Sequence, residues 1–100
     1  MTQTPAALTH DIFVPLVGSI FTLAGWPDGP AFELVEANSL VSHPYPGRTR
    51  DSFRLEFVAD TPEPEQGIRH FDIPGHGEAM IFLVPIERRG DRIVYEAVFN

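Results

Sequence analysis

Two apolar segments close this sequence, and they constrain its fold more than any other feature. They are Ala79–Ile86 (AMIFLVPI) and Ile93–Phe99 (IVYEAVF). Both are short and rich in β-branched and aromatic residues, which favours strands over helices. Water excludes a tail of this hydrophobicity, so the last strand is expected in the core. The polar sequence ERRGDR between the two segments predicts a hairpin loop.

Four earlier segments also have the patterns of strands. Phe53, Leu55 and Phe57 alternate with polar residues, which is the clearest amphipathic pattern in the chain. In Phe32–Leu40, the alternation of apolar and polar residues shifts by one position around Val35–Ala37, and such a shift predicts a bulge or bend. The four expected strands are Ser19–Leu23, Phe32–Leu40, Ser52–Phe57 and Ile68–Ile73.

These six segments and one short N-terminal helix predict an all-β domain. In Leu8–Gly18, Thr9 is a suitable N-cap for the helix, and Pro15 limits the helix to one or two turns. The run AMIFLV has no polar position, so we expect cover on both of its faces, which a single flat sheet does not provide. We therefore expect a small antiparallel six-stranded barrel or two-layer β-roll at residues 8–100, after a disordered tail at residues 1–7.

The composition excludes several classes of function. The net charge is −7, all seven basic residues are Arg, and there is no Cys, so Schiff-base lysines, phosphate-loop lysines, disulfides and thiolate sites are ruled out. An acidic domain repels phosphates, so we expect no nucleic-acid partner. The longest apolar run, about eight residues, is far below the ~20 of a membrane span. No signal-peptide pattern precedes Arg48, the first basic residue, so we expect a cytoplasmic protein.

One segment could hold a metal ion. His70 and Asp72 are two positions apart on an expected strand, so they share a face at a Cα separation of about 7 Å. His76 follows in the turn PGHG. Two imidazoles and a carboxylate are a workable ligand set for a divalent metal. We favour the alternative, a polar outer face that ends in a turn, because no second motif completes the set, and we expect no cofactor.

No pattern in the chain predicts a catalytic centre. None of the serines lies in a G-x-S-x-G motif, and the neighbours Ser42 and His43 point to opposite sides of an extended chain. Glu33 and Glu36 are three positions apart in an expected strand, so their carboxylates are expected to diverge. The sequence therefore predicts a non-catalytic protein.

Two charged loops are candidates for contact with a partner protein. His43–Asp51 is basic, residues 60–65 are acidic, and the two loops flank opposite ends of one expected strand. Contact between the basic end of one molecule and the acidic end of the next would produce rings or stacks. Loops that serve only solubility are the alternative. The candidate residues are Tyr45, Arg48, Arg50, Arg54, Asp60, Glu63 and Glu65.

Two further features could contact a partner. Trp26, in the turn GWPDGP, is either an exposed binding aromatic or folds back over an open end of the barrel. Ser19–Leu23 or Phe32–Leu40, as edge strands, could accept a strand from a partner.

The two ends of the chain also resemble a known family. The residues that carry the resemblance are LTHDIF at 8–13, PLVG at 15–18, FLVP at 82–85 and YEAVFN at 95–100. They resemble a family of short bacterial proteins that is classed as a domain of unknown function, over nearly the whole chain. Members look like near neighbours of phage-tail-collar-type proteins, so the resemblance implies a role in a phage-derived or tail-like assembly and supplies no catalytic residues. Arg69 departs from the pattern, at a position where an aromatic residue is expected.

We therefore expect a non-catalytic protein-interaction or assembly module, with a protein partner or self-association. It would be a small subunit or accessory of a phage-tail-like assembly. The alternative from another class is a small-molecule or metal-binding β-barrel that uses His70, Asp72 and His76 or an apolar pocket near Trp26.

Overall fold

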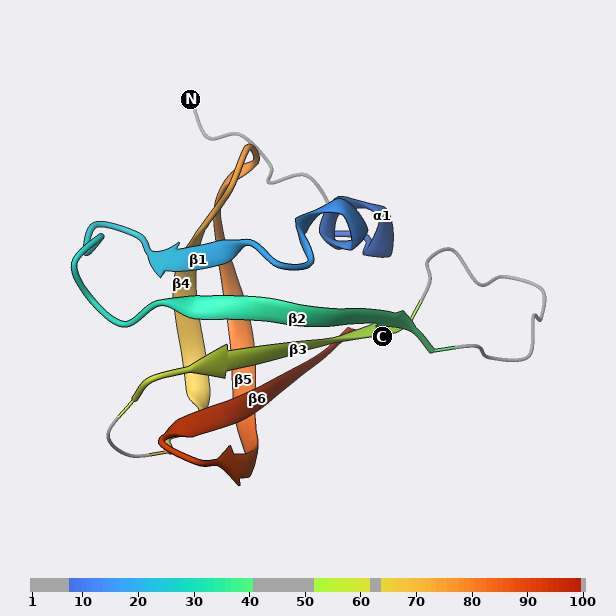
Figure 1. The fold of residues 1–100 in the computed structure, drawn as a ribbon. Helices are drawn as coiled ribbons and strands as arrows, with labels where there is room; N and C mark the ends of the chain where they lie inside the picture. Colours follow the sequence, from blue (N-terminus) through green and yellow to red (C-terminus); the bar gives the residue numbers. More distant parts are fainter. Residues whose placement is uncertain (1–7, 41–51, 62–63, 100) are drawn as a thin grey trace.

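The computed structural model describes residues 8–40, 52–61 and 64–99 (Figure 1). The expected tail at residues 1–7 lies outside these ranges. All six expected strands and the short helix are present, and the last apolar segments form adjacent strands. The elements are α1 (His10–Phe13), the 3-10 helix η1 (Val14–Leu16), β1 (Ile20–Leu23), β2 (Phe32–Ser39), β3 (Phe53–Ala59), β4 (Gly67–Ile73), β5 (Gly77–Arg89) and β6 (Arg92–Phe99).

The six strands form a closed antiparallel ring in the order β1-β2-β3-β6-β5-β4. Two strands change partner along their length. β1 pairs with β2 through its first half and with β4 through its second half. β5 pairs with β4 over Gly77–Leu83 and with β6 over Val84–Arg89. β4 and β5 therefore cross behind β2 and β3 at a steep angle (Figure 1), and the expected closure of the sheet is confirmed.

One hydrophobic core fills the ring, and every strand and α1 contribute to it. The ring of Phe57 packs edge-on against Phe21 at 5.2 Å and stacks on Phe71 at 5.4 Å between centroids. The buried Tyr95 hydroxyl lies 2.9 Å from the hydroxyl of Thr61, which satisfies its polar atom. The core residues are Phe13, Phe21, Phe32, Leu34, Phe53, Leu55, Phe57, Ala59, Phe71, Ile73, Ile81, Leu83, Ile93, Tyr95 and Ala97.

α1 and η1 cover one end of this ring. Phe13 is fully buried, with its ring 5.8 Å from Phe53 and 6.0 Å from Phe99. His10 attaches the helix to β2, because its Nε2 atom lies 2.9 Å from the carbonyl oxygen of Ala37. This contact places α1 beside the end of β2 (Figure 1).

The predicted limit on the helix is also confirmed. Thr9 occupies the N-cap position, although its side chain makes no capping hydrogen bond. Pro15 has no N–H to donate, and from Val14 the chain continues only as a 3-10 turn. Gly18 follows with a positive φ of 94°, a conformation that glycine adopts without strain.

The bulge expected in β2 is present, and it overturns one prediction. The register with β3 shifts between Leu34 and Glu36. Glu33 stands opposite Val58 and Glu36 opposite Glu56, and these two β3 residues are two positions apart. Residues two apart on a strand share a face, so Glu33 and Glu36 both face outward and do not diverge.

The expectation that β5 is covered on both faces is wrong. Ile81 and Leu83 are buried in the core, whereas Met80 and Phe82 are exposed on the outer face. In the closed ring each strand buries its inner face only. The apolar run AMIFLV therefore has its outer face exposed.

The two strands expected at an edge of the sheet, Ser19–Leu23 and Phe32–Leu40, lie within the ring instead. β1 lies between β2 and β4, with its first half paired to β2 and its second half to β4, so Ser19–Leu23 is not the edge strand of a sheet. β2 pairs with β3 along its length, and its other side contacts β1 at Phe32 and Glu33 and the ring of His10 at Ala37. β2 is therefore held from both sides from Phe32 to Ala37.

Candidate interaction surface

Three large apolar side chains lie together on the outer face of β4 and β5. Ile68 stands directly opposite Phe82, and Met80 is two positions from Phe82 on the same face. Ile68 is 64% exposed, Met80 68% and Phe82 50%. Directly opposite Cβ atoms in a sheet are about 5 Å apart, so the three side chains form one continuous surface, which we call the apolar patch.

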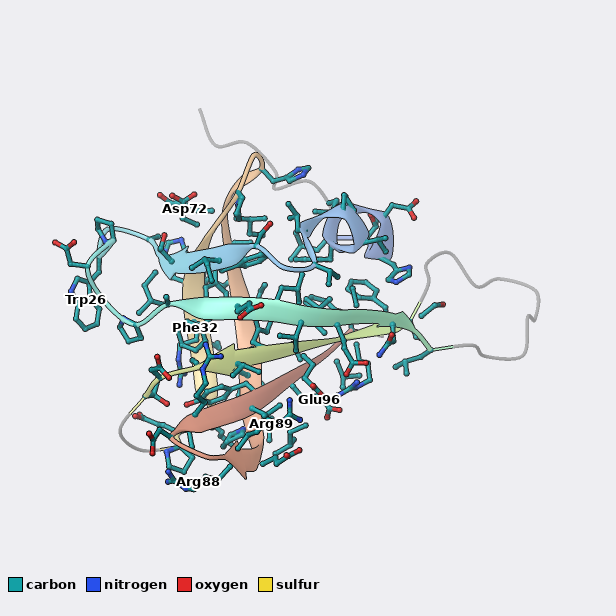
Figure 2. All side chains as sticks on the ribbon, in the orientation of Figure 1. Trp26, Phe32, Asp72, Arg88, Arg89 and Glu96 are labelled. Carbon is teal, nitrogen blue, oxygen red and sulfur yellow. The ribbon has the colours of Figure 1, made fainter. Side chains whose placement is uncertain are left out.

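The apolar patch continues into an acidic end of the hairpin. His70 stands opposite Met80, and Asp72 stands opposite Glu78. The Nε2 atom of His70 lies 3.0 Å from a carboxylate oxygen of Glu78, and both side chains are more than half exposed. Asp72 lies at the opposite end of the molecule from Arg88 (Figure 2). Two carboxylates and one imidazole therefore border the patch on this side.

The structure places His70 and Asp72 on the same outer face, as the spacing predicted. His76 lies in the turn between β4 and β5. Within residues 8–40, 52–61 and 64–99, no three His, Asp or Glu side chains gather into a group that could hold a metal ion. The imidazole of His70 contacts Glu78 instead.

A row of three glutamates crosses the outer face of β2, β3 and β6, and we call it the glutamate row. Glu36 stands opposite Glu56, and Glu56 stands opposite Glu96. Like charges directly opposite one another destabilise a sheet. Arg54 offsets this repulsion, because its Nε donates to Glu96 at 2.8 Å and its Nη2 donates to Glu56 at 3.2 Å. Since Glu56 is 9% exposed, this is a shielded charge cluster rather than a loose surface pair.

Two arginines on this face are held in their charged form. Burial of Arg54 disfavours its charge, but hydrogen bonds to Glu96 and Glu56 outweigh burial, and the pKa of Arg54 is raised. A hydrogen bond to Glu87 raises the pKa of Arg89, and the charge of Glu87 adds to the effect. Both guanidinium groups are therefore permanent cations beside the glutamate row.

The charged residues expected to bind a partner are partly engaged within the molecule. Arg54 belongs to the glutamate row, and Asp60 accepts a hydrogen bond from Nε of Arg92 at 3.2 Å. Glu65 is exposed, and its backbone oxygen accepts a hydrogen bond from Arg69 at 2.7 Å. Tyr45, Arg48, Arg50 and Glu63 lie outside the described residues. Head-to-tail contact between the two loops stays a prediction.

Trp26 is exposed in the connection between β1 and β2. It is 57% exposed, and its side chain lies at the periphery of the molecule (Figure 2). The indole ring lies against Gly29, where an added Cβ would come within 2.5 Å of the ring. Trp26 is therefore an exposed aromatic and does not join the core.

Arg69 takes the place of an expected aromatic residue on the inner face of β4. Its guanidinium carbon lies 5.8 Å from the ring centroid of Tyr95, which is a cation–π contact.

The surface also carries an open hollow of about 250 Å³. Trp26 does not line it; the lining residues are Pro64, Pro85, Glu87, Arg88 and Ile93.

The apolar patch was not predicted from the sequence, although part of its signal was present. Ile68 shares the phase of His70 and Asp72, which the pattern had placed on the outer face. Met80 and Phe82 have the opposite phase to the buried Ile81 and Leu83, but a wholly apolar run conceals its phase. The glutamate row had no such signal, because it depends on the register of three strands.

A family model matches residues 8–99, which include every described helix and strand. The chain belongs to the DUF6916 family. This family is a domain of unknown function, and the resemblance carried by the two ends of the chain is thereby confirmed. No curated protein and no solved structure matches this DUF6916 chain. Within the described residues, no helix has the length and apolar character needed to cross a bilayer.

Proposed function

We propose that this DUF6916 domain is a non-catalytic protein-interaction module and that the apolar patch is its docking surface. The observation that carries the proposal is the exposure of Ile68, Met80 and Phe82 side by side on one sheet face. Contiguous exposed apolar side chains with a polar border are typical of interaction sites. Their burial against a partner contributes about 25 cal/mol for each Å² removed from water.

The surroundings of the patch support a specific partner. The patch lies on a regular hairpin that is paired over Gly67–Ile73 and Gly77–Leu83, so little conformational entropy is lost when a partner binds. Asp72 and Glu78 border it on one side, and charges at a border favour complementary partners over other proteins.

We place this module in the cytoplasm, as a small subunit or accessory of a phage-tail-like assembly. The support is the resemblance of the two chain ends. Genes for tail structural proteins next to the genes of DUF6916 members would agree with this placement. Neighbouring genes with no link to tails would contradict it and would leave the docking surface to be tested separately.

The docking surface is tested by partner capture with matched variants. The double variant Ile68→Ser, Phe82→Ser removes most of the patch, and Ile20→Ser is the control, because Ile20 is 48% exposed on β1 outside the patch. Tagged full-length chains are incubated with extract of the native host, and light scattering after gel filtration measures self-association at low and high salt. We expect wild type and Ile20→Ser to retain the same partner, or to associate equally, and the double variant to lose at least about tenfold in binding.

Circular dichroism and thermal unfolding establish that all three proteins are folded. A wild-type chain that stays monomeric at every concentration, and retains no protein that the double variant loses, would contradict the proposed function.

A further inference from the structure

β5 has a free edge along its first half. β4 pairs with Gly77–Leu83 on one side, but β6 begins to pair with β5 only at Val84. The final residues of β6, Ala97–Phe99, pair with β3 alone. Among the described residues, no strand pairs with Gly77–Leu83 on the side away from β4. The ring is therefore continuous in strand order but open between the first half of β5 and the end of β6.

The backbone groups that face this opening can be assigned. The N–H of Ala24 donates to the carbonyl of His70 at 2.8 Å, so the backbone groups of His70 point toward β1. Met80 stands opposite His70, and in an antiparallel pair, opposite residues either exchange hydrogen bonds or both point away. The N–H and C=O of Met80 therefore point away from β4. The same holds two positions away for Glu78 and Phe82, and we call these backbone groups the free edge.

The side chains of the free edge are the ones that face outward. Met80 and Phe82 belong to the apolar patch, and Glu78 lies at its acidic end. A strand added here would thus extend the apolar patch and would also form hydrogen bonds with the backbone groups of the free edge.

The free edge lacks the features that protect sheet edges from other strands. Proteins block such edges with charged residues, proline or bulges. β5 has Pro85 and a register shift between Pro85 and Glu87, but both lie in the half that β6 covers. The exposed half carries Glu78 as its single charge and is otherwise apolar. An edge of this composition favours strand addition.

A second copy of the chain could pair with only part of this edge. The register centred on Ile81 would set Met80 opposite Phe82, but it would stop at Leu83, because Val84 already pairs with β6, and it would leave Glu78 without a partner strand. Symmetric pairing centred on Met80 would place each Glu78 opposite Phe82 of the other copy, and pairing centred on Glu78 would place two carboxylates opposite each other. Pairing centred on Phe82 would require Val84, which already pairs with β6. A complementary strand instead needs apolar residues opposite Phe82 and Met80 and a basic residue opposite Glu78.

We propose, on the basis of the proposed function, that the partner docks by strand addition. An extended segment of another protein pairs antiparallel with the free edge, in the orientation that β6 has along the second half of β5. Its outward residues are apolar, apolar and basic, in chain order, facing Phe82, Met80 and Glu78. Backbone hydrogen bonds supply much of the affinity, and these three outward positions supply the specificity.

Backbone amide exchange followed by NMR tests the edge directly. In the free protein, we expect the amides of Met80 and Phe82 to exchange on the order of 100-fold faster than those of Ile81 and Leu83, which bond to β4. The probe is a blocked peptide of about seven residues, a typical strand length. Isoleucine, valine and arginine alternate with threonine in it, in that order. We expect the peptide to slow exchange at Met80 and Phe82, and a peptide with glutamate in place of arginine to bind more weakly.

Three results of this experiment would overturn the inference. The first is slow exchange at Met80 and Phe82 in the dilute protein alone. The second is protection that grows with protein concentration and needs no peptide, since a second copy would then occupy the edge. The third is equal binding of the arginine and glutamate peptides.

Met80→Pro separates this inference from the proposed function. Proline removes an N–H that faces the free edge and bonds to no described strand, and Met80→Ala is the matched control that keeps this N–H. We expect Met80→Pro to abolish peptide binding and Met80→Ala to weaken it by less than about tenfold. If Met80→Pro retains the partner that Ile68→Ser, Phe82→Ser loses, the docking surface stands and strand addition fails. If Met80→Pro does not fold, the exchange measurement on the wild type still decides.

Discussion

Arg54 is the cation on which the glutamate row depends. It bonds Glu56 on its own strand and Glu96 on the neighbouring strand, and its side chain is 20% exposed. Because Glu36, Glu56 and Glu96 stand in one line across three strands, removal of the guanidinium that is hydrogen-bonded to two of them would increase their repulsion. A single side chain therefore allows an acidic row to cross a folded sheet.

We expect Arg54→Met to lower the free energy of unfolding by about 1–3 kcal/mol at pH 7. The pKa of Arg54 is raised, so its contribution is complete below the ordinary pKa of arginine and is lost only as pH rises above it. The loss is therefore expected to be the same at pH 7 and pH 9. Urea denaturation at both pH values measures this, with the exposed Arg88→Met as control. A loss no larger than that of Arg88→Met would contradict the role assigned to Arg54.

The helix α1 owes its existence to the strands that it covers. Four residues of α-helix are too short to be stable alone, and Thr9 adds no side-chain cap. The stabilisation comes from Phe13, which is buried among Phe21, Phe53 and Phe99. The helix therefore closes the core at one end rather than folding independently.

Phe13→Ala should cost about 3–5 kcal/mol of stability, because a buried aromatic ring is replaced by a cavity. The matched control is Val14→Ala in the next position, where the side chain is 47% exposed and the expected cost is below about 0.5 kcal/mol. Chemical denaturation monitored by circular dichroism measures both variants. Similar costs for the two substitutions would show that α1 does not cover the core in the way described.

The ring as a whole is most strongly paired at β3 and β6. β3 lies between β2 and β6, and β6 lies between β3 and β5. Both strands also carry much of the buried core, including Phe57 and Tyr95. The hydrogen bonds at the centre of these strands can break only when the ring opens, whereas α1 and η1 cover one end and can detach without opening it.

Native-state hydrogen exchange should therefore resolve two levels of stability. The amides of Phe57 and Tyr95 are expected to exchange only by global unfolding, and the helical amides through a smaller, local opening. Exchange measured at increasing sub-denaturing urea separates the two processes, because global unfolding depends more steeply on urea. Exchange of the central β6 amides at the rate of α1 would contradict the placement of β6 within the core.

Local patterns were sufficient to locate the strands. The alternation of Phe53, Leu55 and Phe57 and the slip around Val35–Ala37 were both read correctly, because they report which side chains face the core. Strand ends were less well predicted. β5 extends to Arg89, since the hairpin turn uses only Gly90, with a φ of 64°, and Asp91.

The candidate site could be predicted only in part. His70 and Asp72 were correctly assigned to one face, and Ile68 belongs to the same face by the same rule. The charged residues were predicted to contact a partner protein because they stand out in the sequence. In the structure, however, Arg54 and Asp60 bond to charges on other elements. Sequence position does not reveal such partners.

The sequence by itself determined which segments become strands, where β2 bulges and where the N-terminal helix stops. These features depend on side-chain period and backbone chemistry within a few residues. Only the tertiary structure decided that β1 and β5 change partner, that Glu36, Glu56 and Glu96 align, and that the first half of β5 keeps a free edge. The physical reason is that backbone hydrogen bonds are alike for any two strands, so the choice of neighbour and register is made by the packing of the whole core.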